Sequence, residues 1–136
     1  MKSIKVWIGS FIIVSLVDYL WHSVIFASFY SKALADAAYM TAGKVAPLLP
    51  FLVVGDLVLT IILVMALADQ GKAMMKGAVV GLLVIAHLAI VNHALIPGWD
   101  VSIIVADAIF GLVAGLLTGI YIDWAGKKSG QSPAQM

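Results

Sequence analysis

The chain has 136 residues, of which 63% are hydrophobic and only 11% charged, and its mean hydropathy is +1.11. A soluble domain averages about 45–50% apolar and about 25% charged residues, so the composition excludes a water-soluble fold. The formal net charge of +1 offers no basic surface for nucleic acid. Because cysteine is absent, disulfides, thiolate metal sites and thiol nucleophiles are excluded as well. The sequence therefore predicts a small integral membrane protein.

Four apolar stretches are long enough to cross a bilayer, which takes about 20 helical residues. We expect these spans at about residues 4–29, 47–68, 73–96 and 99–124. Backbone groups in lipid must be satisfied within their own segment, so the spans are predicted to be helices. The fold class is therefore an all-α, four-helix membrane bundle over residues 1–126, followed by a flexible polar tail at 127–136. We expect the first span to stay uncleaved, because it is too long for a signal peptide and carries an acid and a histidine.

The connections between the spans are short, with one exception. Asp69–Lys72 and Pro97-Gly98 predict tight turns between antiparallel neighbours. The longer first connection contains an alanine-rich stretch, Ser31–Met40, which predicts a short helix at the membrane interface.

Lysine placement predicts the orientation. Six lysines fall on one side of a four-span arrangement and two, Lys32 and Lys44, on the other. Because cytoplasmic loops carry the excess of lysine, both termini are predicted to be cytoplasmic, in a bacterial inner membrane.

Polar side chains gather in the outer half of the predicted bundle. Charged groups inside a span are costly and usually functional. At about 1.5 Å per residue, the three intramembrane aspartates and one histidine lie roughly 12–15 Å from the outer end, and the other polar groups lie about one turn nearer to it. The candidate ligand- or proton-binding residues are Asp18, His22, Asp56, His87, Asn92 and Asp107.

Helical spacing predicts how these residues face. Asp18 and His22 are four positions apart and so share a face, where they could bind one metal ion together. Asn92 is expected to face inward, but His87 and His93 lie about 120° to either side of the inward direction, so both cannot face one site. Glycines at steps of four predict close helix packing and point Asp107 toward protein; they are Gly77, Gly81, Gly111, Gly115 and Gly119.

Several chemistries fit this polar layer. Histidine and carboxylate suit a divalent metal, although no known ligand spacing is present. A proton or ion relay fits buried aspartate and histidine equally well. Haem ligation by two histidines is disfavoured because nothing in their spacing marks it. The sequence neither supports nor excludes an intramembrane enzyme.

Two segments resemble a known family. Leu20-Trp21-His22-Ser23 with Phe26 and Tyr30, and the stretch from Val91-Asn92-His93 to Ala106-Asp107-Ala108 and Phe110-Gly111, are similar to small bacterial four-span proteins of unknown function. Some relatives have an acid where this chain has Ala89. The resemblance implies a four-helix membrane fold and no particular activity.

The leading hypothesis is a polar pocket that binds or translocates a proton, a cation or a small polar ligand. The alternative is a structural or accessory subunit, held by its glycines and polar groups in a homo-oligomer or a larger membrane complex and carrying no ligand of its own.

Overall fold

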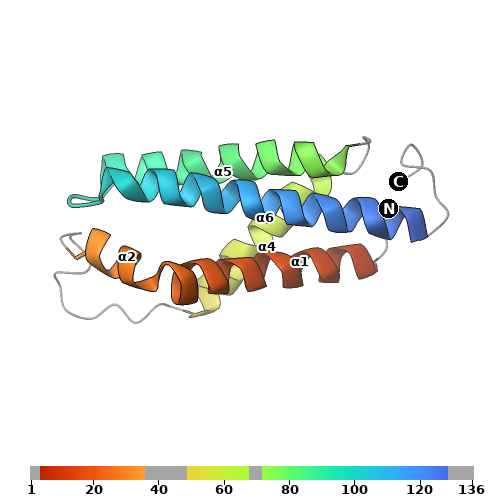
Figure 1. Cartoon of the computed structure of the whole chain (residues 1–136), viewed down its shortest axis with the longest axis horizontal. Helices are drawn as coiled ribbons and strands as arrows, with labels where there is room; N and C mark the ends of the chain where they lie inside the picture. Colours follow the sequence, from red (N-terminus) through yellow and green to blue (C-terminus); the bar gives the residue numbers. More distant parts are fainter. Residues whose placement is uncertain (1–3, 36–48, 68–71, 129–136) are drawn as a thin grey trace.

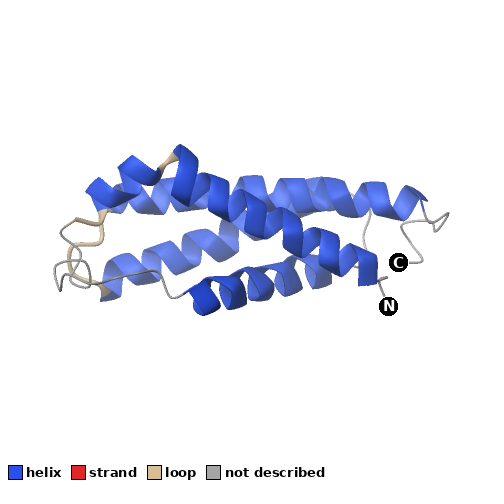
Figure 2. Cartoon of the chain, turned by 90° about the horizontal axis from the view of Figure 1, so that it is seen from below, coloured by secondary structure: helices blue, strands red, loops and turns tan. Residues whose placement is uncertain are grey.

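The computed structural model describes residues 4–35, 49–67 and 72–128. Within these ranges the chain forms helices joined by short turns and has no strand, which confirms the all-helical class (Figure 2). The elements are α1 (Ile4–Tyr19), a π-helical segment (Leu20–Ile25), α2 (Ala27–Ala33), α4 (Leu49–Ala66), α5 (Ala73–Leu95) and α6 (Val101–Lys128).

Three of these helical stretches are long and apolar enough to cross a membrane. They are Ile4–Ile25, Ala73–Leu95 and Val101–Lys127. The predicted second span, 47–68, corresponds to α4, whose apolar part Val53–Ala66 is shorter, and both ends of that span lie outside the described residues. The predicted tail begins inside α6, and residues 129–136 lie outside the described part of the chain.

The first helix is not continuous over its predicted length. It widens into a π-helix at Leu20, and at Phe26 the backbone leaves helical geometry. The Phe26 N–H donates to the Trp21 carbonyl, five residues back, at 2.9 Å. The short helix α2 begins before the predicted interfacial helix, Ser31–Met40, and the part of that prediction from residue 36 onward lies outside the described residues.

The main helices run alternately up and down, so the start of α1 and the end of α6 lie at the same end of the bundle (Figure 1). A small core closes this end: Val6 packs with Val64, Leu67, Ala73 and Ile122. Tyr121 lies over Gly9, and its hydroxyl donates to the Lys5 carbonyl at 2.9 Å. The opposite end carries α2 and the turn between α5 and α6.

Helices α5 and α6 form the closest pair in the molecule, side by side over most of their length (Figure 1). Their backbones touch at glycines: a Cβ at Gly77 would meet the Gly115 carbonyl, and a Cβ at Gly81 would meet that of Gly111. Farther along, Gly119 lies against Ala73 in the same way. Small residues thus let these two helices approach at backbone distance.

Helix α4 starts beside α1 and ends beside the start of α5 (Figure 1). Its C-terminal half is anchored by Leu59 and Leu63, which pack with Val14 and touch Val80 and Val84. Toward its N-terminus α4 leaves α5, and a groove opens between the two helices. The helices are therefore closely packed at the end where α1 begins and α6 ends. Toward the opposite end, the bundle has a groove between α4 and α5.

Gly115→Ala tests the glycine contact. The new methyl group would meet the Gly77 carbonyl, so the helices must separate, and we expect a loss of about 1–3 kcal/mol in the free energy of unfolding. Gly55→Ala is the matched control, since a Cβ at Gly55 meets nothing within 4 Å. Unfolding in mixed detergent micelles, followed by circular dichroism, measures both. Equal stability of the two variants would contradict the contact.

Candidate functional site

Three of the predicted polar residues meet in one cluster where the first helix faces α6. Asp18 and His22 come from consecutive turns at the end of the first helix, and Asp107 comes from the second turn of α6. His22 Nδ1 lies 2.9 Å from Asp18 Oδ1, and His22 Nε2 lies 3.6 Å from Asp107 Oδ1. The imidazole therefore stands between two carboxylates, one at each ring nitrogen.

The surroundings of His22 fix where its first proton lies. Nδ1 is close to two acceptors, the Asp18 carboxylate and the Asp18 carbonyl at 3.1 Å, so it carries hydrogen. Nε2 faces Asp107 at a distance too long for a good hydrogen bond. Without a second proton, the Nε2 lone pair would point at a carboxylate. A proton on either Nε2 or Asp107 removes that repulsion.

Tyr30 completes the cluster and was not among the predicted site residues. In the structure it is only 9% exposed. Its hydroxyl donates to Asp107 Oδ1 at 2.5 Å and accepts from Trp21 Nε1 at 3.2 Å. The break at Phe26 turns α2 back toward α6 and makes this contact. In the sequence, Trp21 and Tyr30 both belong to the segment that resembles the membrane-protein family, which is a signal for their importance. Their contact depends on the backbone break at Phe26, which the sequence does not predict.

Aromatic rings enclose the imidazole. Phe110 meets His22 edge-on with centroids 4.9 Å apart, and the Tyr30 ring lies 4.7 Å away. Trp21 in turn packs on Phe26 at 4.5 Å and on Phe110 at 6.2 Å. These rings cover part of the cluster and leave the side chains of His22, Asp18 and Asp107 half-buried, and a charge in a partly apolar environment is stabilised by a close partner.

The cluster holds two carboxylates for one imidazole. With both acids ionised and the imidazole neutral, the cluster would carry two net negative charges. Protonating the imidazole would still leave the cluster with one net negative charge. Because an uncompensated charge is costly in an apolar surrounding, the arrangement favours taking up a proton or another cation.

The two carboxylates lie at different ring nitrogens, which is not how a chelated metal is held. A metal ion needs several ligand atoms converging on one point. Among the described residues no group of three or more histidine or acidic side chains does so. The geometry of Asp18 and His22 is that of a hydrogen-bonded pair.

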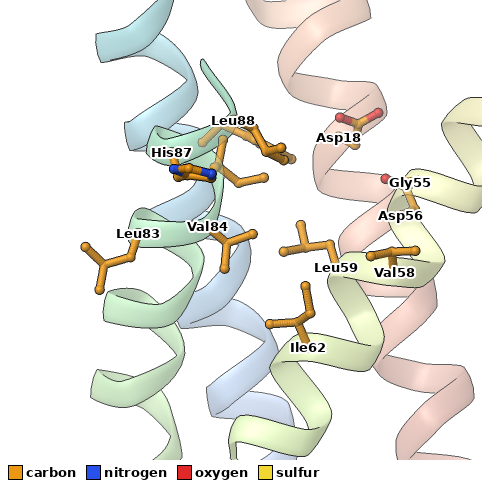
Figure 3. A pocket seen from close by; sticks show the side chains of 12 residues that line it. Asp18, Gly55, Asp56, Val58, Leu59, Ile62, Leu83, Val84, His87 and Leu88 are labelled. Carbon is orange, nitrogen blue, oxygen red and sulfur yellow. The ribbon is translucent and has the colours of Figure 1, made fainter. Parts of the chain in front are cut away.

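Asp56 and His87 do not join the cluster; they line the groove between α4 and α5 (Figure 3). Asp56 lies within electrostatic reach of Asp18 and His22, and its backbone carbonyl accepts from the Thr60 hydroxyl at 2.7 Å. Asp18 lines the same groove. Asp18 is thus the link between the cluster and the groove.

The remaining polar residues of α5 lie near the turn into α6. His93 Nδ1 donates to the Trp99 carbonyl at 2.7 Å, so it fastens the turn, while half-buried Asn92 contributes no hydrogen bond to the cluster. Gly98 supplies the turn with a positive φ of 80°.

Asp100 caps α6: the hydroxyl and backbone N–H of Ser102 lower the pKa of this carboxyl, and the N–H lies 2.7 Å from Asp100 Oδ1.

The fold and cluster together define a helical membrane protein with a half-buried Asp–His–Asp cluster. The chain belongs to the family described as "Predicted membrane protein (DUF2177)", whose profile matches residues 3–122. This membership confirms the resemblance to membrane proteins of unknown function. No curated protein and no solved structure matches the chain.

Tyr30→Phe tests the hydrogen-bond network. The variant keeps the ring against His22 but leaves Trp21 Nε1 and one Asp107 oxygen without their partner. We expect a loss of about 1–3 kcal/mol in the free energy of unfolding, measured in mixed detergent micelles by circular dichroism. The control is Tyr19→Phe, at a side chain on α1 that is 59% exposed. A similar loss in both variants, or none in Tyr30→Phe, would argue against the network.

Proposed function

We propose that this membrane protein binds a proton or small cation between Asp18, His22 and Asp107 and passes it along these groups. The observation that carries the proposal is the imidazole with a carboxylate at each ring nitrogen, at 2.9 and 3.6 Å. The excess of acid over base supplies the driving force for uptake.

The order of the contacts suggests a path. The Tyr30 hydroxyl bonds to Asp107, Asp107 faces Nε2 of His22, and Nδ1 of His22 bonds to Asp18. An imidazole can accept a proton at one nitrogen and release the other from the opposite nitrogen, which is how histidine relays protons. Asp56 and His87 would then extend the path along the groove from Asp18.

Some candidate roles rest on the sequence alone. Asn92 as an orienting donor and a divalent metal held by Asp18 and His22 are both weaker proposals than proton binding, because neither has a described contact that favours it. A structural subunit is the alternative if the cluster exchanges no proton.

Proton flux into liposomes tests the proposal. We expect purified protein, reconstituted with an enclosed pH dye, to speed the decay of an imposed pH gradient. Asp107→Asn and Asp18→Asn keep the side-chain shape but lose the titrating group, so flux should fall to that of protein-free liposomes.

Asp123→Asn serves as the control for this experiment. Asp123 lies near the C-terminal end of α6, and its carboxylate accepts from the Met74 N–H at 3.4 Å, far from the cluster in sequence and fold. This variant should conduct like the wild type. Wild-type flux in Asp107→Asn and Asp18→Asn would overturn the relay.

We further propose four spans in a bacterial inner membrane, with the start of α1 and the end of α6, and so both termini, on the cytoplasmic side. Supporting this, lysines concentrate at the end where α1 begins and α6 ends. The cysteine-free chain suits single-cysteine labelling. In intact cells, a membrane-impermeant maleimide should label Lys32→Cys, an exposed site on α2, and should leave Lys127→Cys unlabelled until the cells are opened. The reverse pattern would invert the orientation.

A further inference from the structure

The groove beside the cluster has the size of a ligand site. Its volume is about 690 Å³, within the range of about 300–1,000 Å³ that small-molecule pockets occupy. Its walls are α4 on one side and α5 on the other (Figure 3). Its rim is made of side chains that face the surroundings of the bundle: Leu83 is 63% exposed and Leu88 52% exposed. In a membrane such a groove opens sideways into the lipid.

The lining is aliphatic over most of its extent and polar at one place. Val58, Leu59 and Ile62 come from α4, and Leu83 and Val84 from α5. The polar side chains are Asp56 on α4, Asp18 on the end of α1 beside it, and His87 on α5 across the groove (Figure 3). A molecule that fills the groove must therefore be apolar along its body and polar where it meets the acids.

The charges determine the sign of that polar part. The His22 imidazole contacts Asp18 and Asp107 directly and acts on Asp56 only through space, so Asp56 has no cation in contact with it among these groups. An anionic head would lie beside two carboxylates and be repelled. A cation would be attracted to both, and the low dielectric of the groove strengthens that attraction.

We infer that the groove between α4 and α5 binds a lipophilic cation, such as a hydrophobic amine or a quaternary onium ion, with its charge at Asp18 and Asp56 and its apolar body against the aliphatic walls. The ligand enters from the lipid.

Cation binding in the groove should also be coupled to proton binding in the cluster. This part of the inference rests on the proposed function, because Asp18 belongs to both the groove and the cluster. The titratable groups that line the groove are Asp18, Asp56 and His87, and those of the adjoining cluster are His22, Asp107 and Tyr30. A cation bound at Asp18 and Asp56 replaces positive charge that a proton would otherwise supply, so its binding should release protons.

Two probes of matched shape and opposite charge test the groove. Tetraphenylphosphonium is a lipophilic cation and tetraphenylborate its anionic counterpart. Equilibrium dialysis against the full-length protein in nanodiscs, with protein-free nanodiscs subtracted, should show saturable binding of the cation and none of the anion. Both ions are permanently charged, so any effect of pH on binding reports on the protein.

Two variants locate the binding site. Asp56→Asn removes one charge and should weaken binding of the cation by about tenfold or more. Gly55→Trp should abolish binding by filling the groove, because a Cβ at Gly55 meets nothing within 4 Å and the new ring can occupy that space. Asp123→Asn, outside the groove, should bind like the wild type. Circular dichroism and elution as a single species confirm that each variant is folded.

The outcomes separate the groove from the relay. Equal binding of cation and anion, or wild-type affinity in both Asp56→Asn and Gly55→Trp, overturns the cation site, whatever the proton flux. If the cation binds with the expected variant pattern but releases no proton into weakly buffered solution, the coupling to proton binding is wrong and the cation site in the groove is still supported. If flux depends on Asp107 but the cation does not bind, the relay stands and the groove inference is wrong.

Discussion

The structure depends on the backbone contact between α5 and α6. Four glycines in register, Gly77 and Gly81 against Gly115 and Gly111, place two carbonyl-lined surfaces against each other where any side chain would separate them. In lipid, where apolar residues gain little by leaving the solvent, such close packing is a main source of association between helices. Tyr121 of this pair packs on Gly9 of α1, whereas α4 packs much less closely on α5 than α6 does and leaves Val53 and Leu57 exposed. The groove follows from this unequal packing.

The same arrangement explains how charged groups are accommodated. Asp107 lies one turn before Gly111, so it enters the bundle where α6 is already held against α5. Its partners come from the other side, from the turn that contains His22 and from α2, which carries Tyr30. Breaking any one pair would leave a neighbouring charge without its partner, and such a loss in an apolar surrounding is usually larger than the gain from the pair itself. The site is therefore held as a unit.

Helical spacing alone could predict part of this site. The four-residue separation of Asp18 and His22 places them on one face, and the structure shows them in contact. The predicted third span, 73–96, differs from α5 by a single residue, because hydropathy and the Pro-Gly turn mark both of its ends. Tyr30 could not be assigned, because its position depends on the π-helix and on the break at Phe26, and neither has a periodic signature in the sequence. Predicted depth could not separate Asp56 from Asp107: Asp56 on α4 lines the groove, whereas Asp107 on α6 faces the imidazole.

The position of the cluster along the helices has an electrical consequence. Asp107 is the seventh residue of α6, roughly 10 Å from its start, about a third of the way across a hydrocarbon core of about 30 Å. A unit charge that moves across the whole core gains or loses about 2.3 kcal/mol per 100 mV, so a charge that reaches Asp107 from the nearer end is subject to about 0.8 kcal/mol. That energy changes an occupancy by about fourfold. A charge taken up by these half-buried acids would therefore respond to the membrane voltage as well as to the composition of the solution outside.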